Sequence, residues 1–137
     1  MASRLPLRPI AVAAGGVVGS WLRWGVSAEY PVATGTFPVT TLAINVAGAA
    51  LLGVVLVVLL DRRPSHPGWH ALLGTGVLGA FTTFSTFAVE VVELARTGDL
   101  VSAVVYATAS IVLGLAAILL TMTAARRVAG VARPVVS

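Results

Sequence analysis

Hydrophobic residues gather in four long stretches that are separated by short polar connections. The stretches run over residues 10–28, 39–60, 71–95 and 100–125. A helix of roughly 20 mostly apolar residues crosses a hydrocarbon core, and each stretch is about that long or longer. Residues 39–60, 71–89 and 100–125 hold no charged side chain. The pattern predicts an all-α integral membrane protein with four transmembrane helices.

The connections collect the residues that end helices. Residues 29–38 hold Pro31, Gly35 and Pro38, residues 61–70 hold Pro64, Pro67 and Gly68, and residues 96–99 hold Gly98. Proline lacks an amide proton and glycine tolerates a positive φ, so both mark turns. No connection is long enough for a second domain. We expect one transmembrane domain over residues 1–125 and a basic tail over residues 126–137.

The third stretch contains a polar cluster at membrane depth. Residues 79–87 read GAFTTFSTF, which places three threonines, a serine and three phenylalanines after Gly79. Lipid offers no hydrogen-bond partners, so these hydroxyls must face protein, water or a bound ion. The glycine and the threonines favour an interruption of the helix near Gly79 to Thr83, and carbonyls released there can hold a cation. We expect this segment to be the functional centre.

The first stretch differs from the others because Arg23 lies inside it. Residues 1–9 resemble the start of a secretory signal, but Arg23 and Trp24 follow within the same stretch, so we keep the segment as mature structure. Gly15 and Gly19 have the GxxxG spacing that lets membrane helices pack closely. Arg23 has two interpretations: it extends to the membrane interface, or it forms a cationic vestibule that attracts an anion.

Polar residues of the second and fourth stretches fall on single helix faces. Thr41 and Asn45 share one such face. Asn45 either bridges two helices or donates to an ion that is losing its water. Tyr106, Ser110 and Gly114 recur every four residues. A lone serine usually bonds back to its own helix, but this alignment predicts a polar track.

Helical spacing in the third stretch places Thr83, Thr86, Phe87 and Glu90 on one stripe, with Phe84 at its edge. Phenylalanines at such spacing usually pack in a core or against lipid, but these alternate with hydroxyls. The edge of a phenyl ring carries partial positive charge and can face an anion. We therefore interpret the stripe as a surface that an anion contacts.

Composition agrees with a membrane protein, since 58% of the 137 residues are apolar, 10% are charged and the mean hydropathy is +0.98. The absence of cysteine excludes disulfides, thiolate metal sites and thiol nucleophiles. His66 and His70 have the spacing of a helical metal pair, but Pro67 and Gly68 separate them, so no zinc site is expected. No catalytic constellation appears, and the sequence predicts no enzyme.

Nine arginines and no lysine give a net charge of +4. In a soluble chain this charge would suggest nucleic acid, but here it indicates orientation, and no nucleic-acid partner is expected. With four spans, the termini and residues 61–70 share one side, which carries Arg4, Arg8, Arg62, Arg63, Arg126, Arg127 and Arg133. The other side carries only Arg96. The positive-inside rule predicts a multi-pass protein of the cell membrane with cytoplasmic termini.

Three segments resemble the signatures of the Fluc/CrcB family of bacterial fluoride channels. They are GxxGSWLRW at residues 16–24, TLxxNxxG at residues 41–48 and GxFTTFSTF at residues 79–87. The resemblance covers all four stretches in order, and the third motif is long and unusual in composition. It implies a passive, fluoride-selective channel that lets cells shed fluoride, built as an antiparallel dimer with two pores. It also implies a structural, non-transported sodium ion between the subunits.

The resemblance implies roles for single residues as well. The backbone carbonyls of Gly79 and Thr82 match the family's sodium ligands. The pore positions match Asn45, Phe84 and Phe87, and the polar track matches Thr41, Tyr106 and Ser110. Arg23 matches a vestibule arginine, Glu90 an acidic position near the pore, and Gly114 stands where the family commonly has a second serine.

Two other functions and two kinds of dimer remain as alternatives. Small multidrug exporters also use four short helices in an antiparallel dimer, but they share a glutamate in the first span, and residues 10–28 hold none. A scaffold subunit is the other function, and replacing Phe84 or Asn45 would then leave ion flux unchanged. Seven arginines against one favour a fixed orientation with an inverted homologous partner over a homodimer of oppositely inserted copies.

Overall fold

A computed structural model describes residues 7–62 and 67–130, and every regular element in those residues is helical. The elements are α1 (Leu7–Glu29), α2 (Val39–Leu56), η1 (Val57–Arg62), α3 (Pro67–Trp69), η2 (His70–Leu78), α4 (Gly79–Phe81), α5 (Ser85–Arg96) and α6 (Leu100–Ala129). The segments η1 and η2 are π-helical and continue their neighbours. The all-helical class that the hydrophobic pattern predicts is confirmed for the described residues.

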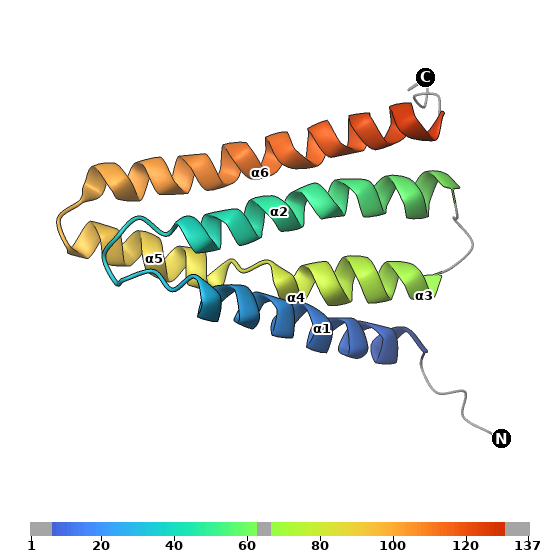
Figure 1. Cartoon of the computed structure of the whole chain (residues 1–137), viewed down its shortest axis with the longest axis horizontal. Coiled ribbons are helices and arrows are strands. Elements are labelled where there is room, and N and C mark those ends of the chain that lie inside the picture. Colours follow the sequence, from blue (N-terminus) through green and yellow to red (C-terminus); the bar gives the residue numbers. More distant parts are fainter. Residues whose placement is uncertain (1–6, 63–66, 131–137) are drawn as a thin grey trace.

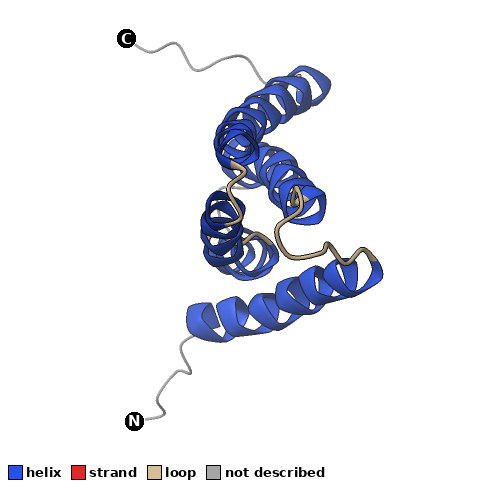
Figure 2. Ribbon diagram, turned by 90° about the vertical axis from the view of Figure 1, so that its left-hand side faces the viewer, coloured by secondary structure: helices blue, strands red, loops and turns tan. Residues whose placement is uncertain are grey.

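The helices run back and forth along the long axis of the molecule (Figure 1). α1 packs against η2 and α4, whereas α2 packs against α6. The start of α1, the end of η1 and the end of α6 lie at one end of the molecule, and the α1–α2 and α5–α6 connections lie at the other (Figure 1). Figure 2 shows α1 along one side of the other helices, at an angle to them.

Within the described residues, three helical segments are long and apolar enough to cross a membrane: Val39–Leu59, His70–Arg96 and Leu100–Ala129. The first predicted span is also helical, as the 23-residue α1, but it is not one of the three. Its glycines, its tryptophans and Arg23 lower its mean hydropathy. Length and composition therefore support three of the four predicted spans.

The fourth helix is longer than the predicted span. It continues to Ala129, and Gly130 then ends it with a φ of 63°, the left-handed conformation common after helix C-termini. The first residues of the predicted tail are therefore helical. Several positions used in the sequence argument lie outside the described residues, namely Arg4, Arg63, His66 and Arg133.

Glycine lets α1 approach η2 closely. A Cβ atom on Gly15 would overlap the carbonyl of Leu72, and one on Gly19 would overlap the carbonyl of Val77. Gly16, the neighbour of Gly15, has open space where its Cβ would be. The close packing predicted from the GxxxG spacing is confirmed as a contact within the chain, and it fixes α1 against the segment that leads into α4.

The third predicted span is interrupted between α4 and α5. Thr82 has an extended backbone with φ −76° and ψ 160°, and the next helix begins at Ser85. Gly79 itself is helical, with φ −63° and ψ −31°. The predicted interruption near Gly79 to Thr83 is confirmed, and it occupies the end of that range. Glycine tolerates helical geometry, and the chain leaves the helix only at Thr82.

Aromatic side chains hold the α5–α6 end together. Tyr106 and Leu94 are fully buried. Phe37 and Phe87 pack against Tyr106, with ring centroids 5.6 and 5.4 Å from it. Many other large apolar side chains point away from the chain, which is the surface that a membrane helix presents to lipid or to another subunit.

Candidate functional site

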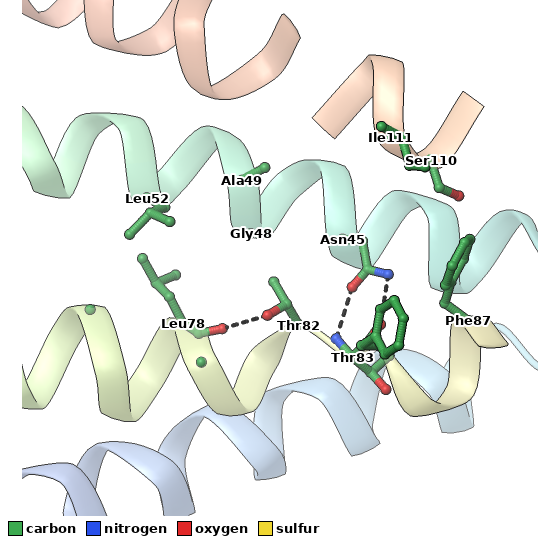
Figure 3. Close-up of a pocket in the computed structure, with 13 residues that line it drawn as sticks. Asn45, Gly48, Ala49, Leu52, Leu78, Thr82, Thr83, Phe87, Ser110 and Ile111 are labelled. Carbon is green, nitrogen blue, oxygen red and sulfur yellow. Dashed lines mark hydrogen bonds between the residues drawn. The ribbon is translucent and has the colours of Figure 1, made fainter. Parts of the chain in front are cut away.

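Asn45 joins α2 to the interruption through both halves of its amide. Its Oδ1 accepts a hydrogen bond from the Thr83 N–H at 2.8 Å, and its Nδ2 donates to the Thr83 carbonyl at 2.9 Å (Figure 3). The bridging interpretation of Asn45 is therefore confirmed. An amide nitrogen carries two donors, and these bonds use one of them, so the second N–H is not committed to Thr83.

Hydrogen bonds to side chains release two backbone carbonyls from the helical pattern. In an unbroken helix the Thr83 N–H would bond the Gly79 carbonyl, but it donates to Asn45 instead. The Thr86 N–H would bond the Thr82 carbonyl, but it donates to the Thr83 Oγ1 at 3.2 Å. The carbonyls of Gly79 and Thr82 thus lose their helical donors.

The carbonyls beside these two are occupied. Leu78 O accepts from both the N–H and the hydroxyl of Thr82, at 3.1 and 3.0 Å. Ala80 O accepts from the Nε of Arg23 at 3.1 Å. Arg23 is half-buried, and its guanidinium lies against the last turn of α4. Cations near a helix C-terminus stabilise it, because the carbonyls there carry partial negative charge.

Hydroxyls of the GAFTTFSTF segment bond to one another at the start of α5. The Thr83 hydroxyl donates to the Thr86 Oγ1 at 3.0 Å, and the Ser85 Oγ lies 3.4 Å from the Thr83 Oγ1. The predicted stripe is confirmed for Thr83 and Thr86, and Ser85 is exposed. The segment satisfies part of its own polar groups within the apolar span.

Glu90 gathers two residues of the predicted polar track. Its Oε1 accepts from the Thr41 hydroxyl at 2.7 Å, and its Oε2 accepts from the Tyr106 hydroxyl at 2.6 Å. Thr41 and Tyr106 are both buried. Hydrogen bonds to a carboxylate are stronger than those between neutral groups, so this cluster ties α2, α5 and α6 together.

Ser110 differs from these residues because its hydroxyl is buried and makes no hydrogen bond within the described part of the chain. Leaving such a group unpaired costs about 1–3 kcal/mol. Buried polar groups without a partner are rare in folded proteins. Ser110 is among the residues that line the cavity that Asn45 also lines (Figure 3).

This cavity has a volume of about 420 Å³ and lies between α2, the interruption and α6 (Figure 3). Six of the predicted site residues line it: Gly79, Thr82, Asn45, Phe84, Phe87 and Ser110. The Phe84 and Phe87 ring centroids are 5.7 Å apart, and the Phe84 side chain is 79% exposed on the single chain. The cavity therefore opens beside an aromatic ring that the chain does not cover.

Other predicted residues lie outside the cavity. Thr41, Tyr106 and Glu90 form the neighbouring cluster, which meets the cavity through the contact of Phe87 with Tyr106. Gly114 does not line the cavity. The contact of Arg23 with Ala80 was missed in the sequence, because a backbone carbonyl carries no side-chain signature.

Metal ligands of the usual kind are absent from the described residues, which hold no group of three or more histidine, cysteine or acidic side chains. Any cation held at the interruption would therefore be bound by backbone, hydroxyl or amide oxygens. The released carbonyls of Gly79 and Thr82 are of that kind, and interrupted membrane helices use such carbonyls to coordinate sodium.

Comparison with known proteins gives a consistent result. Residues 10–122 match the family described as CrcB-like protein, Camphor Resistance (CrcB). The chain is 43% identical to the fluoride-specific ion channel FluC 1 of Streptomyces coelicolor over 117 residues, which are 85% of this chain and 76% of the relative. It is 40% identical to the FluC channel of Saccharophagus degradans over 113 residues, 82% of this chain and 85% of the relative.

A third relative is the fluoride-specific ion channel FluC of Acidobacterium capsulatum. It is 40% identical over 118 residues, which are 85% of this chain and 94% of that relative. The region that matches the family includes every residue placed at the interruption and at the Glu90 cluster. The candidate site therefore lies entirely within the part of the chain that matches the family.

Proposed function

The chain belongs to the CrcB family of multi-pass membrane proteins, which are ion channels and not enzymes, and on this premise we propose that it conducts fluoride. The proposed flux is passive and lowers the cytoplasmic fluoride concentration. The observation that carries the proposal is the cavity at the interruption, where Asn45, Ser110 and two phenyl rings converge inside an apolar span. The three relatives described above are named as fluoride-specific channels.

The chemistry of the cavity suits a small anion that holds its water strongly. Conduction requires that binding replace the hydration shell without becoming too tight to release the ion. The second N–H of Asn45 and the unpaired hydroxyl of Ser110 are two such donors. The ring edges of Phe84 and Phe87 add weak positive potential without strong binding.

The Glu90 cluster continues the path in the proposal. The hydroxyls of Thr41 and Tyr106 now donate to the Glu90 carboxylate, and a rotating hydroxyl can donate to an anion instead. Because the Glu90 carboxylate repels fluoride, the hydroxyls of Thr41 and Tyr106 must lie between the carboxylate and the ion. Thr41 and Tyr106 are therefore proposed to pass the ion along the path beside Glu90.

A structural sodium ion fits the interruption. The chain and an inverted homologous subunit would together offer four carbonyl oxygens, those of Gly79 and Thr82 and their two counterparts in the partner, and in this chain both carbonyls have lost their helical donors. When bound, such an ion would supply a fixed positive potential near the cavity. The residues of the chain bind it through the backbone, and it is not transported.

The membrane topology in the proposal has four spans, with α1 as the first. Arg8 lies near the start of α1, Arg126 and Arg127 near the end of α6, and Arg62 at the end of η1. These ends share one side of the molecule, while Arg96 lies at the other (Figure 1). By the positive-inside rule, both termini lie in the cytoplasm of a cell whose plasma membrane holds the protein.

The proposed assembly is an antiparallel dimer with an inverted homologous partner. The arginine bias fixes one orientation, so a copy of the chain does not readily supply the inverted subunit. The exposed Phe84 ring and the open cavity support a second subunit at this face. Family membership favours the channel over the small multidrug exporter, whose first-span glutamate is absent from residues 10–28.

Vesicles test the proposed function directly. The chain is reconstituted alone and together with a copy whose arginine bias is reversed, and efflux is followed with a fluoride-selective electrode. Fluoride efflux is expected in at least one preparation, and chloride efflux should be slower by at least about 100-fold, as weak donors matched to a small ion require. Chloride flux comparable to fluoride flux would contradict the assigned selectivity.

A further inference from the structure

The end of α4 distributes its carbonyls among different partners. Leu78 O accepts two bonds from Thr82, Ala80 O accepts from Arg23, and Thr83 O accepts from Asn45. Gly79 O and Thr82 O, which lie between these along the chain, have lost their helical donors. Carbonyls that accept hydrogen bonds and carbonyls that have lost their donors therefore lie within one six-residue segment. Side chains from α1 and α2 occupy two of the accepting carbonyls.

Arg23 reaches Ala80 from a helix whose position is fixed. Gly19, one turn before Arg23, meets the backbone of Val77 and Phe81 so closely that no Cβ would fit. The backbone of α1 is therefore in close contact with the end of η2 and with α4 at this glycine. Arg23 is half-buried, and its Nε lies 3.1 Å from the Ala80 oxygen. A donor delivered this rigidly fixes the peptide plane that it bonds.

That peptide plane lies between the two released carbonyls. Ala80 follows Gly79 directly and precedes Thr82 by two residues, so a rotation at Ala80 would move both of them. Asn45 fixes the far side of the segment through its two bonds to Thr83. Arg23 and Asn45 thus hold the two ends of the stretch that carries the candidate ligands.

We infer that Arg23 is a positioning residue for the cation site: it keeps the Ala80 carbonyl out of the ligand set and orients those of Gly79 and Thr82. The inference rests on the proposed sodium site. The guanidinium is itself a cation and repels sodium, so its charge and its hydrogen bond act in opposite directions. The directional Nε–H bond is the part that lysine, whose ammonium is a point charge, does not reproduce.

Thermal unfolding of the chain paired with its bias-reversed copy, titrated with sodium at constant ionic strength, tests this inference, and each substitution is made in both copies. An ion that binds only the folded state raises the midpoint in a concentration-dependent way. Arg23→Met should raise the sodium concentration for half of that shift about tenfold, as loss of a charge-assisted hydrogen bond implies. Arg23→Lys keeps the charge and should recover little of the affinity. Arg96→Met removes an arginine at the other end of the third span and should behave as the unmodified chain.

The outcomes separate a positioning role from a structural one. An equal drop of the midpoint with and without sodium, at unchanged half-saturation, would mean that Arg23 only stabilises the fold and would overturn the inference. Tighter sodium binding in Arg23→Met would overturn it because charge repulsion would then dominate, and wild-type affinity in Arg23→Lys would overturn it because the directional Nε–H bond would then not be needed. A chain whose midpoint ignores sodium would also overturn it, and fluoride efflux measured on the same samples reports separately whether the proposed function survives.

Discussion

At the scale of single residues, Asn45 and Ser110 differ in the number of hydrogen bonds that they make within the chain. Asn45 spends one oxygen and one N–H on the backbone of Thr83, so its replacement would disturb the interruption as well as any ion path. Ser110 has no partner in the described residues. Its loss would remove a donor from the cavity without breaking a bond of the fold, which makes it the sharper probe.

Ser110→Ala should lower fluoride efflux by about tenfold, the factor that corresponds to 1.4 kcal/mol in the barrier. The unfolding midpoint should stay unchanged or rise, because an unpaired buried hydroxyl destabilises the fold. Electrode efflux and thermal unfolding of the same preparation measure the two quantities. Thr108→Val serves as the control, since Thr108 is exposed on the same helix outside this cavity. Unchanged efflux in Ser110→Ala would exclude this hydroxyl from the path.

The sequence predicted which side chains line the cavity better than it predicted their partners. Asn45, Phe84, Phe87 and Ser110 were found because polar or aromatic residues inside an apolar span need a reason to be there. The bond from Arg23 to Ala80 and the position of Glu90 between two hydroxyls depend on how the helices cross. No pattern along the chain encodes those distances.

At the scale of elements, close glycine contacts decide where α1 lies. The hydrophobic pattern predicted all four helices, with ends within a few residues for most of them. It left two ends approximate that depend on hydrogen bonding: the interruption predicted near Gly79 to Thr83 begins at Thr82, and α6 continues past the predicted end to Ala129. Hydropathy alone cannot place such ends, because the side chains on both sides of them are equally apolar.

Gly19→Ala should destabilise the protein, because its Cβ would overlap the Val77 carbonyl and both backbones would have to move apart. Overpacking of this kind costs typically about 1–3 kcal/mol. Gly16→Ala is the matched control, since its Cβ would meet open space and alanine favours the helix. The unfolding midpoint compares the two variants. An equal effect of both would mean that α1 does not cross η2 at Gly19.

The cap of α6 gives a pH-dependent expectation. Hydrogen bonds from the side chain and the backbone N–H of Ser102 lower the pKa of Asp99, and the N–H lies 2.9 Å from its Oδ1. The ionised group therefore stabilises the folded state above the ordinary pKa of aspartate, and this stabilisation is lost as pH falls through the lowered pKa. Asp99 is exposed, so the effect is small.

Asp99→Ala should lower the unfolding midpoint at neutral pH, and the difference from the unmodified chain should shrink toward pH 3. Asp99→Asn is the control, because asparagine also caps helices and does not titrate. Its midpoint should therefore lose less on acidification than that of the unmodified chain. If the difference in unfolding midpoint between Asp99→Ala and the unmodified chain did not depend on pH, the charge of Asp99 would not contribute to the cap.

At the scale of the whole molecule, one chain leaves its candidate site open on one side. The Phe84 ring is 79% exposed and the cavity opens next to it. The sequence predicted a dimer from the family resemblance and an inverted partner from the arginine bias. Both predictions concern how two subunits assemble.

Reversing the arginine bias tests the proposed partner. In the reversed copy, Arg62, Arg63, Arg126 and Arg127 become glutamine, and arginines are introduced into residues 29–38. The chain alone should give little fluoride efflux, and the mixture with the reversed copy should exceed it by at least about tenfold, because insertion follows the excess of arginine. Full efflux from the unmodified chain alone would establish that it pairs with itself.

The released carbonyls of Gly79 and Thr82 have a consequence for any survey of variants. A backbone oxygen survives every replacement of the side chain attached to it, so exchanging either residue does not delete the oxygen. A saturation screen would instead assign importance to distant positions that set the angle of the peptide groups, such as Asn45 and Arg23. Such a screen would identify the side chains that orient the carbonyl groups, and it would miss the carbonyl oxygens of Gly79 and Thr82 themselves.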